Sequence, residues 1–192
     1  MKLSVITVVF NDVAGLEKTI LSVIEQRAYF APIEYVVIDG GSADGTRELI
    51  EKYDEHIDAW VSESDDGIYD AMNKGIGLST GDALLFLNAG DYFVGNVLGE
   101  LSSAPTFLRV KYRDILGRFR NRPVVSEKLG IPNCHQGIVF ERSEIKYDTS
   151  YRICADYKYF LDHGYTSKID LLPTDGYVYF DAVGVSATSV RQ

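Results

Sequence analysis

Residues 3–12, LSVITVVFND, decide the fold class of this chain. A nearly unbroken apolar run rich in β-branched residues is typical of a strand buried on both faces of a parallel sheet. Asn11 and Asp12 follow at once, and both residue types favour a turn and the start of a helix. Leu16 and Ile20 then recur at helical spacing. The stretch predicts a strand–turn–helix unit of an α/β protein.

The same unit recurs through the first half of the chain. Further apolar strands are predicted at residues 35–38, 57–61 and 83–87, with helices between them. Four β-α units predict a mostly parallel, Rossmann-like sheet flanked by helices, with right-handed crossovers. The second half is less regular and predicts a hairpin at 107–122, a helix at 153–163 and strands at 166–172 and 177–180.

We expect one domain over residues 1–192, because no linker or low-complexity tract divides the chain. The charge is nevertheless uneven. The whole chain carries 19 basic and 28 acidic side chains, a net charge of −9, which argues against general nucleic-acid binding. Residues 1–95 hold 6 basic and 17 acidic side chains, net −11, and residues 96–192 hold 13 and 11, net +2. The two halves are expected to face different partners.

Cysteine usage and hydropathy predict a cytoplasmic protein. The two cysteines fit neither a disulfide scaffold nor a zinc motif, which favours a reducing compartment. No apolar run approaches the ~20 residues that span a bilayer, and the N-terminal apolar run is too short for a signal peptide.

Polar residues follow each predicted strand, where open parallel sheets bind ligands. The residues that follow the four predicted strands are Asn11-Asp12, Asp39-Gly40-Gly41-Ser42, Glu63-Ser64-Asp65-Asp66 and Asn88-Ala89-Gly90-Asp91. This acidic rim suits a base, a ribose or a divalent cation. The loop after the first strand lacks both the G-x-G-x-x-G of a dinucleotide-binding dehydrogenase and the P-loop.

Four segments, taken in order, resemble the family 2 glycosyltransferases with a GT-A fold: SVITVVFND, EYVVIDGGSADGT, SESDDGIYDAMNKGI and TGDALLFLNAGD. The resemblance is closest to the small bacterial group that builds capsular, exopolysaccharide or lipopolysaccharide sugars. It covers residues 3–93 and continues more weakly through CHQGIVFERS, YDTSYRICADYKYFL and the GVS at 184–186. It implies inverting transfer from a UDP- or GDP-linked donor to a saccharide or a lipid-diphosphate-linked acceptor.

The resemblance also assigns the donor-binding residues. Asp39 matches the family aspartate that contacts the base or ribose, and the alternative is a cap on the helix that begins near Ser42. Asn11 and Asp12 match the loop after the first strand or serve as an ordinary N-cap. The remaining donor-binding candidates are Gly41, Asp65, Asp70, Asn73 and Lys74. Lys74 would offset diphosphate charge or stand as a solvated lysine.

Asp91 is the candidate ligand of a divalent cation, Mn²⁺ or Mg²⁺. The common family motif is D-x-D with a further Asp or His, whereas this chain has Asn88-Ala89-Gly90-Asp91 and one carboxylate. Hard cations prefer oxygen ligands and retain several waters, so one carboxylate and two phosphate oxygens suffice. The alternative is a turn aspartate after the strand.

On the acceptor side, the resemblance makes Asp156 the catalytic base. An inverting transfer needs a base within about 3 Å of the acceptor hydroxyl. A first-turn helix carboxylate is the alternative. His135 and Gln136 match a loop that meets the acceptor or the diphosphate, although a lone histidine is more often structural.

A basic segment has no counterpart in the family pattern. Residues 109–122 read RVKYRDILGRFRNR, in which basic side chains alternate with other residues on both predicted strands. Which face of the hairpin these basic side chains occupy depends on the register of the two strands. The segment either contacts anionic lipid headgroups at the inner face of the cell membrane or a lipid-diphosphate acceptor, or it forms a solvated hairpin edge protected by charge. The basic residues are Arg109, Lys111, Arg113, Arg118, Arg120 and Arg122.

Two other functions stay open. A sugar-phosphate nucleotidyltransferase would be expected to carry a glycine-rich basic loop after the first strand, and VVFNDVAG is neither. A non-catalytic sugar-nucleotide-binding relative is favoured by the thinned metal motif and opposed by Asp156. A donor-hydrolysis assay separates the enzyme from that relative.

Overall fold

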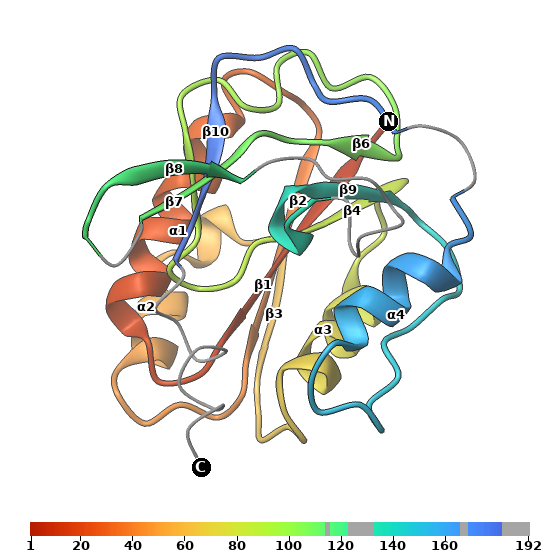
Figure 1. Cartoon of the computed structure of the whole chain (residues 1–192). Helices are drawn as coiled ribbons and strands as arrows, with labels where there is room; N and C mark the ends of the chain where they lie inside the picture. The colour runs from red at the N-terminus through yellow and green to blue at the C-terminus, as the bar shows by residue number, and fades with distance from the viewer. Residues whose placement is uncertain (114–115, 123–132, 166–168, 182–192) are drawn as a thin grey trace.

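The computed structural model describes residues 1–113, 116–122, 133–165 and 169–181 (Figure 1). Its main sheet has six strands in the order β3-β2-β1-β4-β9-β6. β1 pairs in parallel with β2 and β4, and β2 pairs in parallel with β3. The strands are β1 (Leu3–Val9), β2 (Ile33–Asp39), β3 (Ala59–Ser62), β4 (Ala83–Phe86), β6 (Thr106–Phe107) and β9 (Ile138–Glu141).

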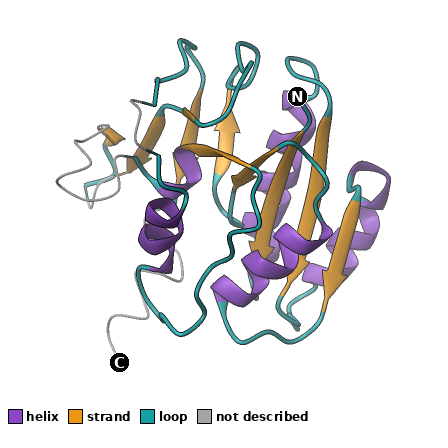
Figure 2. Ribbon diagram, turned by 90° about the vertical axis from the view of Figure 1, so that its right-hand side faces the viewer, coloured by secondary structure: helices purple, strands orange, loops and turns teal. Residues whose placement is uncertain are grey.

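Helices cover both faces of this sheet (Figures 1 and 2). On one face, α1 (Val13–Gln26) and α2 (Thr46–Lys52) pack Leu16, Ile20 and Ile50 against alternate residues of β1 and β2. On the other face, α3 (Ile68–Leu78) and α4 (Ala155–Asp162) pack with the remaining strand residues. Short 3₁₀ turns lie at Asp54–His56 (η1) and His135–Gly137 (η3). The predicted α/β class with a mostly parallel sheet is confirmed.

Gly75 allows α3 to lie close on β1. A side-chain carbon at this position would stand 2.4 Å from Cγ2 of Ile6, much closer than two carbons approach. The close approach holds the first turn of α3 beside the carboxyl ends of the strands, where the pocket described below is found.

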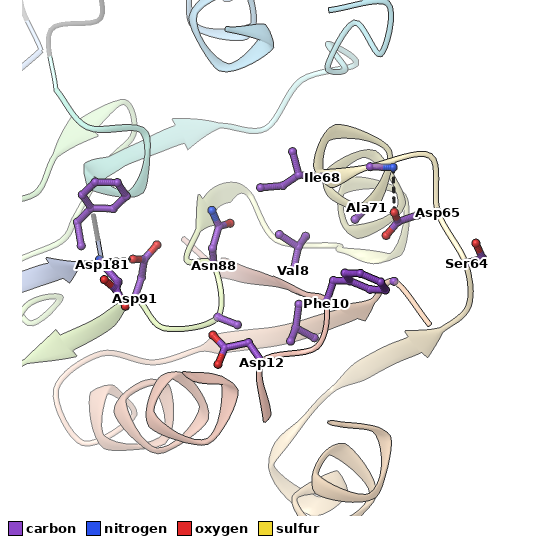
Figure 3. A pocket seen from close by; sticks show the side chains of 15 residues that line it. Val8, Phe10, Asp12, Ser64, Asp65, Ile68, Ala71, Asn88, Asp91 and Asp181 are labelled. Atoms are coloured by element: carbon purple, nitrogen blue, oxygen red, sulfur yellow. Dashed lines mark hydrogen bonds between the residues drawn. The ribbon is translucent and has the colours of Figure 1, made fainter. Parts of the chain in front are cut away.

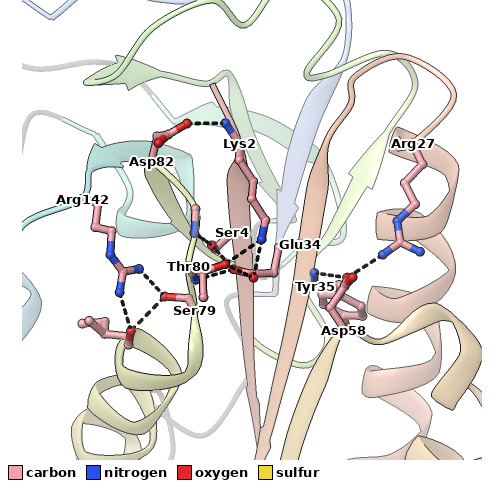
Figure 4. A network of polar contacts seen from close by, with 12 residues as sticks. Lys2, Ser4, Arg27, Glu34, Tyr35, Asp58, Ser79, Thr80, Asp82 and Arg142 are labelled. Atoms are coloured by element: carbon pink, nitrogen blue, oxygen red, sulfur yellow. Dashed lines mark hydrogen bonds and ion pairs between the residues drawn. The ribbon is translucent and has the colours of Figure 1, made fainter.

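A buried carboxylate joins the amino-terminal ends of the parallel strands (Figure 4). Glu34 of β2 accepts hydrogen bonds from Lys2 Nζ at 2.7 Å, from Ser4 Oγ at 2.5 Å and from Thr80 N at 2.6 Å. Burial alone would raise the pKa of Glu34, but these donors outweigh burial and lower it to about 2. The charged form therefore ties β2 to β1 and to the loop before β4.

A second sheet follows the order β5-β10-β7-β8, with β5 (Tyr92–Val94), β7 (Val110–Arg113), β8 (Phe119–Arg122) and β10 (Tyr177–Phe180). β7 and β8 form the predicted antiparallel hairpin, and their register pairs Lys111 with Asn121 and Tyr112 with Arg120. Directly opposed residues share a face. The basic residues of the two strands therefore lie on opposite faces, Lys111 on one and Arg120 on the other.

Three features of the structure differ from the sequence prediction. β9 extends the main sheet by antiparallel pairing with β4 and β6 pairs antiparallel with β9, and the sequence did not predict β5. The predicted strand at 166–172 is wrong over its described residues, because Leu171 forms only an isolated bridge with Phe107. Its first three residues and the GVS segment lie outside the described residues. Within the described ranges, no helix has the length and apolar character needed to cross a bilayer.

Candidate donor-binding site

A pocket of about 400 Å³ opens at the carboxyl ends of β1, β2, β3 and β4 (Figure 3). Strand-end loops supply most of its wall, and the end of β10 and the first turn of α3 complete it. Its lining includes Val8, Phe10, Asp12, Gly40, Ser64, Asp65, Ile68, Ala71, Asn88, Asp91 and Asp181. The topology explains the location, because the helices that follow β1 and β2 cover one face of the sheet, α3 after β3 covers the other, and the strand order reverses between β1 and β4.

The two ends of the pocket differ in chemistry (Figure 3). One end gathers the apolar side chains of Val8, Ile68 and Phe10, with Asp65 at its edge. Phe10 is 57% exposed although it is aromatic. The opposite end carries Asp91 and Asp181. The pocket therefore offers a flat apolar surface at one end and carboxylates at the other.

Asp91 is buried at the acidic end, with only 3% of its surface exposed. Its Oδ1 accepts the backbone N–H of Asp181 at 2.8 Å. Burial is the main cause that raises the pKa of Asp91 to about 8; the nearby Asp181 carboxylate acts in the same direction, and hydrogen bonds from the backbone act against it. A negative charge at Asp91 is thus unfavourable without a compensating positive charge.

The loop after β4 leaves space between carboxylates. Gly90 has a φ of +91°, a conformation that favours glycine. A side-chain carbon there would lie 3.6 Å from Oδ2 of Asp12 and 3.7 Å from Oδ2 of Asp181. Oδ1 of Asn88 is buried and has no hydrogen-bond partner in the described structure.

These oxygen groups fit a hard divalent cation. Carboxylate and amide oxygens are the ligands that Mg²⁺ and Mn²⁺ prefer. Within the described ranges, no three His, Cys, Asp or Glu side chains gather closely enough to hold a metal by themselves. By themselves the described residues therefore offer only a partial set of oxygen ligands around Asp91.

Asn11 and Asp39 hold the pocket loops together from outside its wall. The Asn11 N–H donates to Ser42 Oγ at 2.8 Å, and Asn11 Oδ1 accepts the N–H of Ala43 at 2.9 Å. Asp39 is fully buried and accepts hydrogen bonds from Oγ of Ser42 and of Ser62. Asp12, in contrast, lines the pocket and also caps α1 by accepting the Gly15 N–H at 2.9 Å.

The candidate residues of the third segment likewise lie partly in the pocket wall and partly outside it. Asp65 lines the pocket, and its Oδ1 accepts the Gly67 N–H at 2.9 Å. Lys74 forms ion pairs with Glu63 at 2.9 Å and Asp70 at 3.5 Å, outside the wall. Gly41, with a φ of +84°, also lies outside it.

Asn73 is used structurally. Its Nδ2 donates to the carbonyl of Tyr147 at 2.9 Å, and its Oδ1 accepts the Tyr147 N–H at 2.8 Å. This pair of bonds fastens α3 to the loop before α4. The side chain is not part of the pocket wall.

The predicted acceptor-side residues are not part of the pocket wall. His135 is buried, and its Nε2 shares a 2.5 Å hydrogen bond with the Tyr147 hydroxyl. Burial lowers the pKa of His135 to about 4, so the ring is neutral near pH 7. Gln136 is also buried, and its side-chain oxygen accepts a hydrogen bond from the Cys134 thiol. Asp156 is half-buried in the first turn of α4.

Sequence reasoning missed two pocket residues, Phe10 and Asp181. Phe10 directly follows a buried strand and was absorbed into its apolar run; its place beside Asn11 at the strand end was the available signal. Asp181 follows β10, about 90 residues after Asp91, and only the sheet pairing brings the two together.

Comparisons with known proteins agree with this geometry. An uncharacterized glycosyltransferase of Mycobacterium tuberculosis is 48% identical over 92 residues, which are 48% of this chain and 35% of that protein. A PGL/p-HBAD biosynthesis glycosyltransferase of Mycobacterium bovis is 28% identical over 185 residues, covering 81% of this chain and 67% of that protein. This chain thus spans about a third of the M. tuberculosis relative.

Solved structures share the fold. S. aureus TarS has a TM-score of 0.73 at 17% identity, over 95% of this chain and 37% of that chain. The mannosyltransferase PcManGT from Pyrobaculum calidifontis, in complex with GDP-Man and Mn²⁺, has a TM-score of 0.64 at 17% identity, over 90% and 55%. The family model described as Glycosyl transferase family 2 matches residues 4–104. With just over half of its length matched, the chain belongs to glycosyltransferase family 2 and has a GT-A-type fold.

Proposed function

We propose that this glycosyltransferase moves a sugar from a nucleoside-diphosphate donor to a saccharide or lipid-diphosphate-linked acceptor, with inversion, in cell-surface polysaccharide synthesis. The observation that carries the proposal is the two-ended pocket, with Phe10 at one end and Asp91 at the other. A nucleoside diphosphate has the same polarity, an aromatic base at one end and an anionic diphosphate at the other.

The apolar end would hold the base. The exposed face of Phe10 offers a stacking surface, and Asp65 at its edge offers a carboxylate acceptor for base or ribose hydrogens. Asn11 and Asp39 would act one step away, by fixing the loops that carry Phe10 and Gly40. Fold relatives have been solved with UDP, UDP-GlcNAc and GDP-Man, which supports a UDP- or GDP-linked donor.

The acidic end would hold the diphosphate through a cation. When bound beside Asp91, Mn²⁺ or Mg²⁺ supplies positive charge that neutralises the leaving diphosphate. Asp12 and Asp181 border the same space and would contribute further oxygen atoms. Lys74 is already paired with two carboxylates, so a direct role on the diphosphate would require it to exchange those partners.

Asp156 would deprotonate the acceptor hydroxyl. It lies in the first turn of α4, next to the first turn of α3, whose Ile68 lines the donor pocket. The region around Asp156 would be supported structurally by His135, which is buried and neutral, and by Gln136, whose side chain is already hydrogen-bonded. A cytoplasmic location at the inner face of the membrane fits a lipid-linked acceptor, and the PGL/p-HBAD biosynthesis relative supports a cell-envelope product.

Replacing Asp156 by Asn tests the assignment of the base. A general base contributes ~10²–10⁴ in rate, whereas a lost helix cap costs about 1 kcal/mol of stability. Asp156→Asn should therefore abolish most transfer while donor affinity and melting temperature stay unchanged. Asp162→Asn, in the last turn of the same helix, is the matched control. Transfer by Asp156→Asn within a few-fold of wild type would exclude the base role.

A further inference from the structure

The first turn of α4 lacks a side-chain cap of its own. Cys154 precedes the helix with a φ of +68°, a left-handed conformation that non-glycine residues rarely adopt, and its side chain makes no capping bond. Strained backbone persists where surrounding structure holds it. Another element must therefore fix the turn that carries Asp156.

Tyr69, in the first turn of α3, provides that contact. Its hydroxyl donates to Oδ1 of Asp156 at 3.5 Å. Burial raises the pKa of Tyr69 to about 12 and the Asp156 carboxylate also raises it, whereas hydrogen bonds from the backbone amides of Asp156 and Ala155 act in the opposite direction. The phenol thus stays protonated, faces the first amides of α4 and remains a donor to the carboxylate.

The ring of Tyr69 is held in place by a stack of aromatic rings. Tyr69 stacks on Tyr147 at 5.5 Å with a 19° interplanar angle, and Tyr147 stacks on Tyr159 of α4 at 4.2 Å and 10°. Tyr147 is fixed in turn by His135 and by the two backbone bonds from Asn73. The Tyr69 hydroxyl therefore has a defined direction.

We propose that Tyr69 is a positioning residue, whose hydroxyl orients the Asp156 carboxylate so that its second oxygen can take the acceptor proton. The inference rests on the proposed function. Because Tyr69 follows Ile68, which lines the donor pocket, one turn of α3 borders both the donor and the base. This arrangement would keep the base at a constant distance from the bound donor.

Tyr69→Phe tests the inference, because it keeps the ring and removes the hydroxyl. Hydrogen bonds to charged groups are typically worth more than neutral ones, so we expect the transfer kcat to fall about 5- to 20-fold with donor KM within twofold. The matched control is Tyr159→Phe, from the same ring stack, because the Tyr159 hydroxyl is buried and has no hydrogen-bond partner among the described residues. Its kcat should stay within twofold. A Tyr69→Phe kcat within twofold of wild type, or an equal loss in the control, would overturn the proposal.

A double-mutant cycle separates this proposal from the base assignment. In an Asp156→Asn background, Tyr69→Phe should cost less than twofold, since its effect passes through the carboxylate. A further loss as large as that in the wild-type background would show an independent role and reject the proposal. Full transfer by Asp156→Asn alone would instead reject Asp156 as the base. An inactive Asp156→Asn with an unaffected Tyr69→Phe would reject only the positioning role.

Discussion

At the scale of single residues, the side chains that follow the strands divide into those that face the pocket and those that build it. Asp12, Asp65 and Asp91 reach the wall, whereas Asn11 and Asp39 use their polar atoms in hydrogen bonds to neighbouring loops. Both kinds occupy equivalent places in the sequence. The two kinds differ in whether the packing of the loops brings a hydrogen-bond partner within reach of the side chain.

Phe10 offers a residue-scale prediction. Its side chain is more than half exposed, so Phe10→Ala should change the melting temperature little. If the ring stacks on the base, its removal should weaken nucleoside-diphosphate binding about 10-fold, in line with aromatic stacking energies of about 1–3 kcal/mol. Calorimetric titration measures this. Phe30→Ala, which removes a partly buried ring packed elsewhere on the core, is the control. Unchanged affinity in Phe10→Ala would remove the stacking role.

At the scale of elements, the first half follows its sequence closely. The strand predicted within residues 3–12 and the helix predicted between the strands at 57–61 and 83–87 match β1 and α3, because long apolar patterns in parallel α/β units leave few alternatives. The elements of the second half are predicted less well from the sequence. β9 is a short strand whose place in the main sheet depends on antiparallel pairing with β4 across more than 50 residues of chain, and β6 joins the sheet only by pairing with β9. Local patterns carry no such information.

The Glu34 contacts give an element-scale prediction of stability (Figure 4). Because the folded pKa of Glu34, about 2, lies below its ordinary value, folding favours the ionised form. The stabilisation is therefore fully present above about pH 4.5 and is lost as the pH falls towards 2. Glu34→Gln should lower the free energy of unfolding at pH 7 by about 1–3 kcal/mol and flatten its acid dependence.

Denaturant unfolding at several pH values measures this effect. Glu51→Gln is the control, since Glu51 lies in an exposed i,i+4 pair with Arg47. An acid dependence between pH 4.5 and 2 that is identical in Glu34→Gln and wild type would contradict the account.

The hairpin register makes the membrane hypothesis more specific. Lys111 and Arg113 share a face with Phe119, and Arg120 lies on the opposite face. Lys111 lies over the Tyr177 ring at 4.0 Å, and Arg113 lies over the Phe119 ring at 4.8 Å. Basic and aromatic side chains together are typical of surfaces that contact anionic lipid headgroups.

If this face meets the membrane, replacing Lys111 and Arg113 with Gln should reduce binding to vesicles containing acidic lipid by about 30-fold, at ~1 kcal/mol per charge. Replacing Arg118 and Arg120 with Gln removes the same charge and should matter less. Vesicle sedimentation at low and high salt measures both. Equal binding by all three proteins would leave the solvated-edge interpretation.

At the scale of the whole molecule, the charge distribution constrains the mechanism. Most of the donor pocket's wall comes from the half of the chain with net charge −11, 6 basic against 17 acidic side chains, and the second half adds Asp181 to it. Such a half repels a diphosphate unless positive charge is supplied with the ligand. The central claim is therefore that Asp91 binds the donor's diphosphate through a divalent cation.

Calorimetric titration of UDP and GDP into wild type and Asp91→Ala, each in Mn²⁺ and in EDTA, tests this claim most directly. Asp66→Ala, which removes an exposed carboxylate outside the pocket wall, controls for net charge. The account predicts that in Mn²⁺ Asp91→Ala binds its nucleotide at least about 10-fold more weakly than wild type and Asp66→Ala. It predicts no loss in EDTA, where no cation links the Asp91 side chain to the phosphates. Equal affinity of Asp91→Ala and wild type in Mn²⁺ would contradict it.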